Sequence, residues 1–198
     1  SVGAEHVFAP HALDAVLRAQ VIDHRVAEVG LAAGLGVARQ AGLERAHRSG
    51  FVHRDLKPQN VMLLGEDDEE EHAKILDFGL VGLVEPDTAA HTQLTTRGMF
   101  FGTPAYMSPE QISGEPVGPP SDLYALGVMM YAMLTGELPF RGDLRELAHQ
   151  HVTKPAPRPN LDYGGLTDVV MKLLNKEPDA RLTRGREVAA AIDATLLA

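Results

Sequence analysis

The chain has 198 residues, of which 44% are hydrophobic and 23% are charged, a composition typical of a globular protein with one hydrophobic core. Its formal net charge of -9 argues against a nucleic-acid-binding protein, because such proteins are normally basic. The absence of cysteine excludes disulfides and thiolate metal sites and is compatible with a cytoplasmic location.

The first 50 residues carry apolar positions at helical spacing. One helix is predicted between Ala12 and Ile22 and a second from about Val26 to Arg48. The pair Gly34 and Gly36 could begin a phosphate-binding loop of the G-x-G-x-x-G type. Arg39 occupies the place of its third glycine, so we favour helices here.

Residues His53–Asn60 gather a carboxylate, an ammonium and an amide within one short loop. The apolar runs Phe51–Val52 and Val61–Leu64 flank the loop, and both are too short for helices. Pro58 prevents a helix between them. We therefore expect a loop on a two-stranded base, with its polar side chains pointing the same way.

The three polar side chains of this loop suit phosphate and metal chemistry. Asp55 could accept a proton from an attacking hydroxyl group, and Lys57 could neutralise charge on a transferring phosphoryl group. The Asn60 carbonyl oxygen could bind a hard cation. Taken alone, the loop is compatible with several reactions.

An acidic run at residues 66–71 follows the second of these strands. We interpret it as a solvated hairpin tip, because it lacks the spaced Asx and Gly residues of a calcium-binding loop. A further strand-like run, from Ile75, ends in Asp77, Phe78 and Gly79, which places a second carboxylate directly after a strand.

Together these motifs resemble a known family. His53-Arg54-Asp55 with Asn60, then Asp77-Phe78-Gly79, then Ser108-Pro109-Glu110, are similar in order and spacing to the signature of eukaryotic-type protein kinases. Lys57 resembles the serine/threonine branch. The alanine-rich helices and the stretch Tyr106–Gln111 resemble bacterial members of the family.

The resemblance implies a mainly α fold (α+β overall). We expect residues 1–198 to form the C-terminal large lobe of a kinase domain, with a central buried helix and a small β-hairpin region that carries the catalytic loop. Lys57 is the first lysine of the chain, so the glycine-rich loop and strand lysine of the small lobe have no counterpart upstream.

The resemblance also assigns roles to the polar residues. Asp55 would orient and deprotonate the acceptor hydroxyl, and Lys57 would stabilise charge on the γ-phosphoryl group of ATP. Asn60 and Asp77 would hold Mg²⁺ and, with Lys57, the nucleotide. His53 would be a structural residue and not the base.

Residues 77–110 resemble the activation segment, in which Phe78 and Gly79 complete the motif begun by Asp77. Thr88, Thr92, Thr95 and Thr96 are candidate phosphorylation sites. Thr95 and Thr96 are preferred, and Arg54 would bind the phosphate. Thr103 would hydrogen-bond towards Asp55 and Lys57, and it favours Ser or Thr as the acceptor.

The remaining assignments concern the lobe's framework. Glu110 should pair with Arg181, and residues 122–134 should form the buried central helix, with Ser121 and Asp122 as N-terminal caps. Asp122 would also hydrogen-bond the loop backbone near His53.

Three further helices are predicted at about residues 143–152, 166–175 and 185–197. The segment His149–His151 is interpreted as helix surface and not as a metal site. The longest apolar run, Leu123–Leu134, is about half of what a membrane span needs.

The preferred hypothesis is a serine/threonine protein kinase that uses ATP and Mg²⁺, acts on a protein substrate, and needs a small lobe for activity. The alternative is a non-catalytic kinase-like lobe that binds a partner protein. We expect no nucleic acid partner, no membrane segment in this chain and a cytoplasmic location, while membrane anchorage of a longer parent chain stays open. An exposed lobe face could also support a homodimer.

Overall fold

The computed structural model describes residues 41–64, 72–76, 104–160 and 165–196. The first predicted helix, the acidic run and the residues of the predicted activation segment before Pro104 lie outside these ranges. The site residues concerned are Asp77, Phe78, Gly79, Thr95, Thr96 and Thr103.

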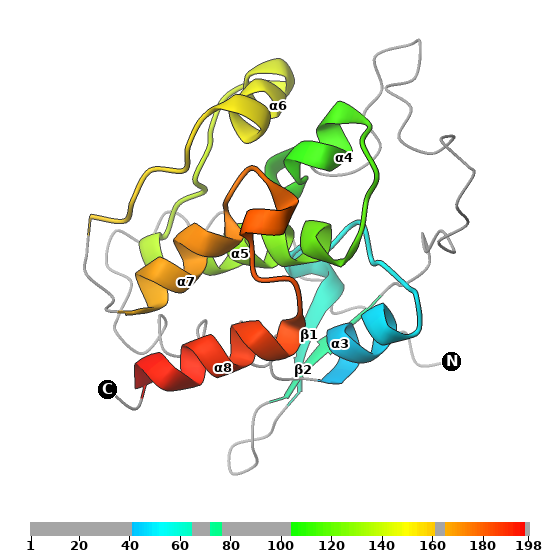
Figure 1. Ribbon diagram of the computed structural model, residues 1–198. Helices are drawn as coiled ribbons and strands as arrows, with labels where there is room; N and C mark the ends of the chain where they lie inside the picture. The colour runs from blue at the N-terminus through cyan, green and yellow to red at the C-terminus, as the bar shows by residue number, and fades with distance from the viewer. Residues whose placement is uncertain (1–40, 65–71, 77–103, 161–164, 197–198) are drawn as a thin grey trace, which may run out of the picture.

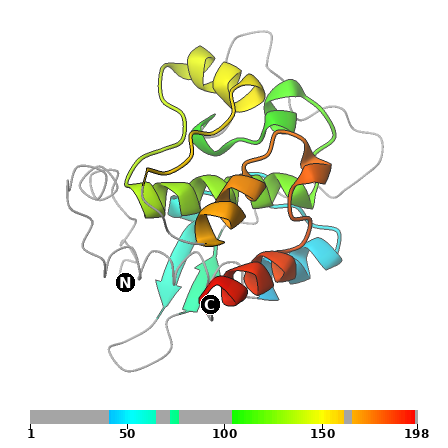
Figure 2. The same cartoon turned by 60° about the vertical axis from the view of Figure 1, so that its left-hand side comes forward.

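A long central helix organises the described fold (Figures 1 and 2). This helix, α5, is apolar all round and is buried from Ser121 to Tyr131. Helices α4 and α6 lie on one side of it, and α3, α8 and a two-stranded hairpin lie on the other. The helices are α3 (Ala41–Arg48), α4 (Pro109–Ser113), α5 (Pro119–Thr135), α6 (Leu144–Thr153), α7 (Gly165–Leu173) and α8 (Gly185–Leu196).

The predicted central helix is confirmed, but the prediction of its start is wrong. Gly118 is the N-cap, and Pro119 with Pro120 forms the start of the first turn, where a missing N–H is no loss. Ser121 and Asp122 therefore lie inside the first turn. The Ser121 hydroxyl still accepts a hydrogen bond from the Gly118 N–H at 3.3 Å.

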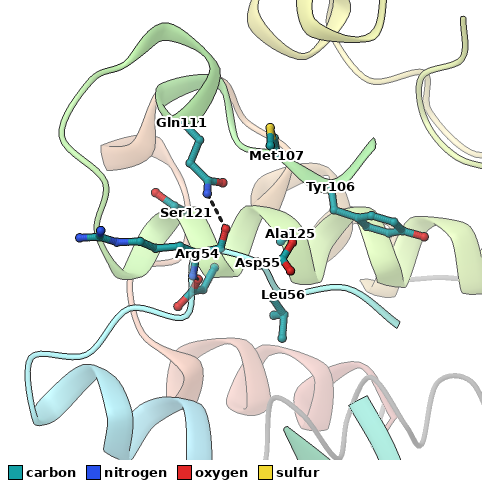
Figure 3. Close-up of a pocket in the computed structure, with 9 residues that line it drawn as sticks. Arg54, Asp55, Leu56, Tyr106, Met107, Gln111, Ser121 and Ala125 are labelled. Carbon is teal, nitrogen blue, oxygen red and sulfur yellow. Dashed lines mark hydrogen bonds between the residues drawn. The ribbon is translucent and has the colours of Figure 1, made fainter. Parts of the chain in front are cut away.

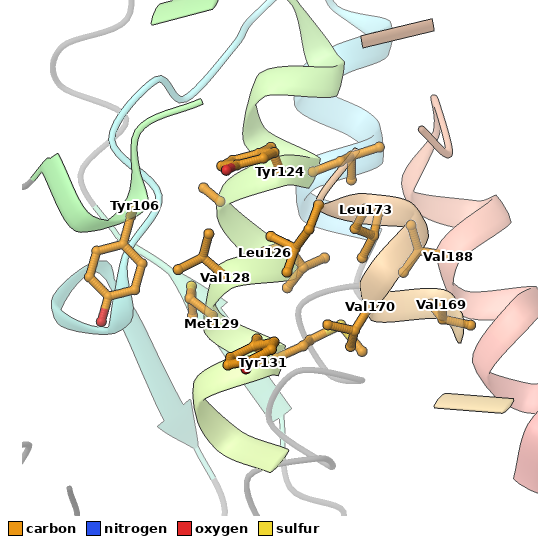
Figure 4. Close-up of a cluster of buried hydrophobic side chains, with 14 of the residues drawn as sticks. Tyr106, Tyr124, Leu126, Val128, Met129, Tyr131, Val169, Val170, Leu173 and Val188 are labelled. Atoms are coloured by element: carbon orange, nitrogen blue, oxygen red, sulfur yellow. The ribbon is translucent and has the colours of Figure 1, made fainter. Parts of the chain in front are cut away.

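Helix α7 packs directly against α5. A Cβ atom at Gly127 would lie 2.7 Å from the Cβ of Leu173, so glycine permits this close approach. Figure 4 shows Val170 and Leu173 of α7 facing α5, with Val188 of α8 behind them. These contacts join three helices in one hydrophobic core.

The two strands form an antiparallel hairpin. β1 (Val61–Leu64) pairs with β2 (His72–Ile75), and Val61 lies opposite Ile75. The predicted strand at Phe51–Val52 is not part of this sheet. The partner of β1 is instead the strand that follows the acidic run.

The last three helices lie within about two residues of their predicted positions. The described residues are mostly helical with one small hairpin, as predicted. No helix among them has the length and apolar character needed to cross a membrane.

The prediction that His151 lies on the helix surface is wrong, because its side chain is fully buried. The Tyr124 hydroxyl lies 2.9 Å from its Nδ1, and the Phe140 ring packs edge-on at 4.9 Å between centroids. These partners come from outside α6, so helical spacing does not reveal them. Burial, followed by the nearby Lys176 charge, lowers the pKa of His151 to about 4.

A buried ion pair joins α4 to the segment before α8, as predicted. Arg181 donates to both carboxylate oxygens of Glu110, at 2.7 and 2.8 Å. Its other three N–H groups donate to the backbone carbonyls of Asn175, Lys176 and Pro120. Burial alone would raise the pKa of Glu110, but the hydrogen bonds from Arg181 and Ser121 outweigh it and hold that pKa below its ordinary value.

We expect the stability of the protein to fall as the pH decreases from 7 to 4. The unfolded chain protonates His151 near pH 6.5 and the folded protein only near pH 4, so the unfolded state binds more protons in this window. The contribution lost is about 3 kcal/mol. Urea unfolding at several pH values should show a smaller pH dependence for His151→Phe, whereas exposed His149→Phe should behave like the wild type.

Replacing Glu110 by Ala should lower the free energy of unfolding by about 3–5 kcal/mol, because the buried Arg181 charge loses its partner. The matched control is Asp168→Ala, which breaks an exposed pair with Arg158 (2.7 Å) and should cost less than about 1 kcal/mol. Urea denaturation measures both. Equal effects would contradict the structural role of the buried pair.

Candidate active site

The loop His53–Asn60, called the catalytic loop from here on after the role predicted for it, is attached to the start of α5 by one carboxylate. Asp122 is buried and accepts the backbone N–H groups of His53 and Arg54, each at 2.8 Å. His47 of α3 donates from Nε2 to the same carboxylate at 2.8 Å. The predicted contact between Asp122 and the loop backbone is therefore present.

Three predicted site residues come together in this loop. Lys57 Nζ lies 2.6 Å from Asp55 Oδ2, and the two side chains are 19% and 24% exposed. The Asn60 amide donates to the Asp55 backbone carbonyl at 2.8 Å and to Oδ2 at 3.3 Å. Among the described residues, no partner donates to Asp55 Oδ1, which leaves this oxygen available to accept a proton.

Asn60 fits the predicted role of a metal ligand. Its side-chain NH₂ group donates to Asp55, and its side-chain oxygen, Oδ1, receives no hydrogen bond within the described ranges. An amide oxygen is a ligand type that Mg²⁺ uses. The described residues contain no cluster of three or more His, Asp or Glu side chains that could hold a metal, and Asp77 lies outside them.

The catalytic loop also holds the end of β2. His53 Nε2 donates to the Leu76 carbonyl at 3.0 Å, and the Leu76 N–H donates to the Asn60 carbonyl at 2.8 Å. Leu76 directly precedes Asp77 in the chain. The imidazole of His53 thus makes a framework contact, as its predicted structural role requires, while that role itself stays a prediction.

A small pocket lies beside the catalytic loop (Figure 3). Burial raises the pKa of Tyr106 in its wall to about 12, so this phenol stays protonated at neutral pH. The Arg54 Nε is buried and has no hydrogen-bond partner among the described residues. The lining residues are Arg54, Asp55, Leu56, Tyr106, Met107, Gln111, Ser121, Asp122 and Ala125.

Two residues of this region were missed by the sequence predictions. His47 binds Asp122, 75 positions away, and nothing in the local sequence indicates it. Gln111 closes a capping box with Ser108, which the S-x-x-Q pattern does predict. The same side chain also donates to the Arg54 carbonyl, 57 positions away, and no local pattern predicts that bond.

Comparison with known proteins identifies the family of the chain. The family model described as "Protein kinase domain" matches residues 21–193, so the chain belongs to the protein kinase family. The predicted family is confirmed.

Its relatives include bacterial serine/threonine kinases. Serine/threonine-protein kinase pkn2 of Myxococcus xanthus is 43% identical over 77% of this chain and 19% of the relative. Serine/threonine-protein kinases drp72 of Corynebacterium efficiens is 39% identical over 82% of this chain and 30% of the relative. PknL of Mycobacterium tuberculosis is 40% identical over 63% of this chain and 29% of the relative. The matched region thus spans less than a third of each of these relatives.

Replacing Asp122 by Asn should destabilise the protein by about 3 kcal/mol, because the amide places an NH₂ group against a backbone or imidazole donor. Chemical denaturation measures this loss. The control Asp168→Asn makes the same chemical change at an exposed site and should be nearly neutral. A neutral Asp122→Asn variant would show that the carboxylate does not anchor the loop.

Proposed function

We propose that this chain supplies the phosphotransfer machinery of a serine/threonine protein kinase. The observation that carries the proposal is the arrangement of Asp55, Lys57 and Asn60. Two donors hold Asp55 Oδ2, while Oδ1 accepts nothing from the described residues. This is the geometry expected of a general base that is fixed in place and faces an acceptor hydroxyl.

In this proposal Asp55 orients the acceptor hydroxyl and takes its proton. Lys57 is bonded to Asp55, so its ammonium group lies beside the atom that attacks and can stabilise negative charge on the transferring group. Phosphoryl transfer depends mainly on positioning and on charge stabilisation, and both residues serve these two needs.

ATP would supply the γ-phosphoryl group, and Mg²⁺ would neutralise the charge on its phosphates. Asn60 would contribute its carbonyl oxygen to the metal, and Asp77 its carboxylate. Support for the Asn60 role is the orientation of its amide, which turns the NH₂ group towards Asp55 and leaves the oxygen free of described donors. Lys57 would complete the nucleotide contacts.

Control of the site by phosphorylation is also proposed. The Arg54 Nε is buried and has no hydrogen-bond partner among the described residues, so its N–H is available to bind an anion. Phosphorylated Thr95 or Thr96 would supply that anion. Thr103 would contact Asp55 and Lys57.

We also propose that residues 1–198 form the large lobe of a kinase domain and that the substrate is a protein with a Ser or Thr acceptor. The chain would bind no nucleic acid and would be located in the cytoplasm. A homodimer is the least supported. The large apolar side chains exposed in the described part of the chain, Phe51, Met62 and Leu144, belong to three separate segments.

The test measures transfer of phosphate from labelled Mg²⁺-ATP to a generic basic protein, for the chain and for the product of its whole open reading frame. Asp55→Asn should lower the transfer rate by about 10²–10⁴-fold, because the proton acceptor is lost. The control Asp168→Asn should leave the rate unchanged. Hydrolysis of the product should yield phosphoserine or phosphothreonine and not phosphotyrosine.

Two results would overturn this proposal. One is equal transfer by the wild type and Asp55→Asn. The other is that neither the chain nor the product of its whole open reading frame transfers phosphate or binds Mg²⁺-ATP in calorimetry. That result would favour a non-catalytic binding module.

A further inference from the structure

Arg54 has an unusual backbone conformation directly before the proposed base. Its φ of 66° makes it the one non-glycine residue with positive φ in the described ranges. A side chain makes this conformation unfavourable, and it persists only where the surroundings hold it. The Arg54 N–H donates to Asp122 of α5, and its carbonyl accepts from Gln111 of α4 at 2.6 Å. Two helices therefore hold this one residue.

The orientation of the Gln111 amide follows from its partners (Figure 3). A backbone carbonyl only accepts hydrogen bonds, so the NH₂ group must face Arg54. The Gln111 Oε1 accepts the Ser108 backbone N–H at 3.0 Å, a position that only an acceptor fits. One side chain thus closes the capping box of α4 and also bridges to the catalytic loop.

The carbonyl held by Gln111 belongs to the peptide that joins Arg54 to Asp55. Because a peptide is planar, the direction of this carbonyl fixes the direction in which the chain enters Asp55. Lys57 and Asn60 restrain the Asp55 carboxylate, but neither bonds to this peptide plane. Its N–H donates to His53 Nδ1 at 3.3 Å, a longer contact than the 2.6 Å bond from Gln111 to its carbonyl. A rotation of the peptide would therefore reorient the base.

We propose that Gln111 is a positioning residue for phosphoryl transfer, acting through the Arg54–Asp55 peptide. The inference rests on the function proposed above. Gln111 does not act on substrate itself. It also links the base to the 3-10 turn Pro104–Tyr106, which precedes α4 and ends the segment predicted to seat the acceptor residue. Docking of that segment and alignment of Asp55 would thus be coupled.

The discriminating variant is Gln111→Glu, which has the same shape. The introduced carboxylate can still accept from Ser108, as in the S-x-x-E capping box, but it cannot donate to Arg54. We expect kcat to fall about 10–100-fold at pH 7.5, with the KM for ATP within about two-fold of wild type, because the loss is one of alignment.

Acidification provides a signature that a purely structural role would not give. A protonated carboxyl group regains a donor for the Arg54 carbonyl, so the ratio of the variant's kcat to that of the wild type should rise as the pH decreases from 8 to 5.5. The matched control is Gln150→Glu, which removes the same type of bond, from Gln150 Nε2 to the Arg141 carbonyl at 2.7 Å, far from the loop. Its kcat should equal that of the wild type.

A Gln111→Glu variant with wild-type kcat, or a loss of kcat that acid does not relieve, would overturn the inference. If this variant does not fold, Gln111→Leu replaces it, and unchanged kcat in that variant overturns the inference equally. If the wild type transfers no phosphate, the proposed function fails separately. In that case hydrogen exchange of the His53, Arg54 and Asp55 backbone amides tests whether Gln111 holds the loop. Faster exchange than in the wild type in Gln111→Glu, but not in Gln150→Glu, supports the inference. Equal exchange rates in Gln111→Glu and the wild type overturn it.

Discussion

The catalytic loop depends on the Asp122 carboxylate. The backbone N–H groups of His53 and Arg54 both donate to this side chain. Asp122 lies in the first turn of α5, a helix that is buried nearly all round. A negative charge in a first turn is favoured by the helix dipole, so the carboxylate suits its place in α5 as well as its partners. Because α5 cannot shift without disturbing the core, the loop shares the rigidity of the core. The contacts from His53 to Leu76 and from Asp55 to Lys57 start from the part of the loop whose position Asp122 fixes.

Helix α4 forms a second support for the site, and buried polar contacts fix its position. Its Glu110 is held by Arg181 and Ser121, and its Gln111 reaches the catalytic loop. Buried ion pairs add little net stability, since the cost of desolvating both charges offsets most of their attraction. Their benefit here is geometric, because a helix of five residues has little apolar surface with which to define its own position.

The sequence predicted the helices and the hairpin better than it predicted the polar contacts. Apolar residues around the whole of α5 identified a buried helix, and helical spacing located α6, α7 and α8. Periodicity shows which face of an element is apolar, but it does not show which distant group satisfies a buried polar atom. The burial of His151 depends on Tyr124 and Phe140 from outside its helix, and for that reason it was missed. Motif resemblance supplied the partners of Glu110 and Asp122, whereas the contacts of His47 and Gln111 with distant partners became visible only in the fold.

The hydrogen bonds of Arg181 have a consequence for how this sequence can diverge. All five of its N–H groups are occupied, two by one carboxylate and three by carbonyls that point inward from separate places. A lysine brings three donors on a single atom and cannot reach these acceptors together. Replacing Arg181 by Lys would thus leave buried backbone carbonyls without hydrogen-bond donors. Even this substitution, which conserves the charge, is therefore unfavourable at this position. A lineage that lost the arginine would have to change Glu110 as well, so the two positions are expected to vary together.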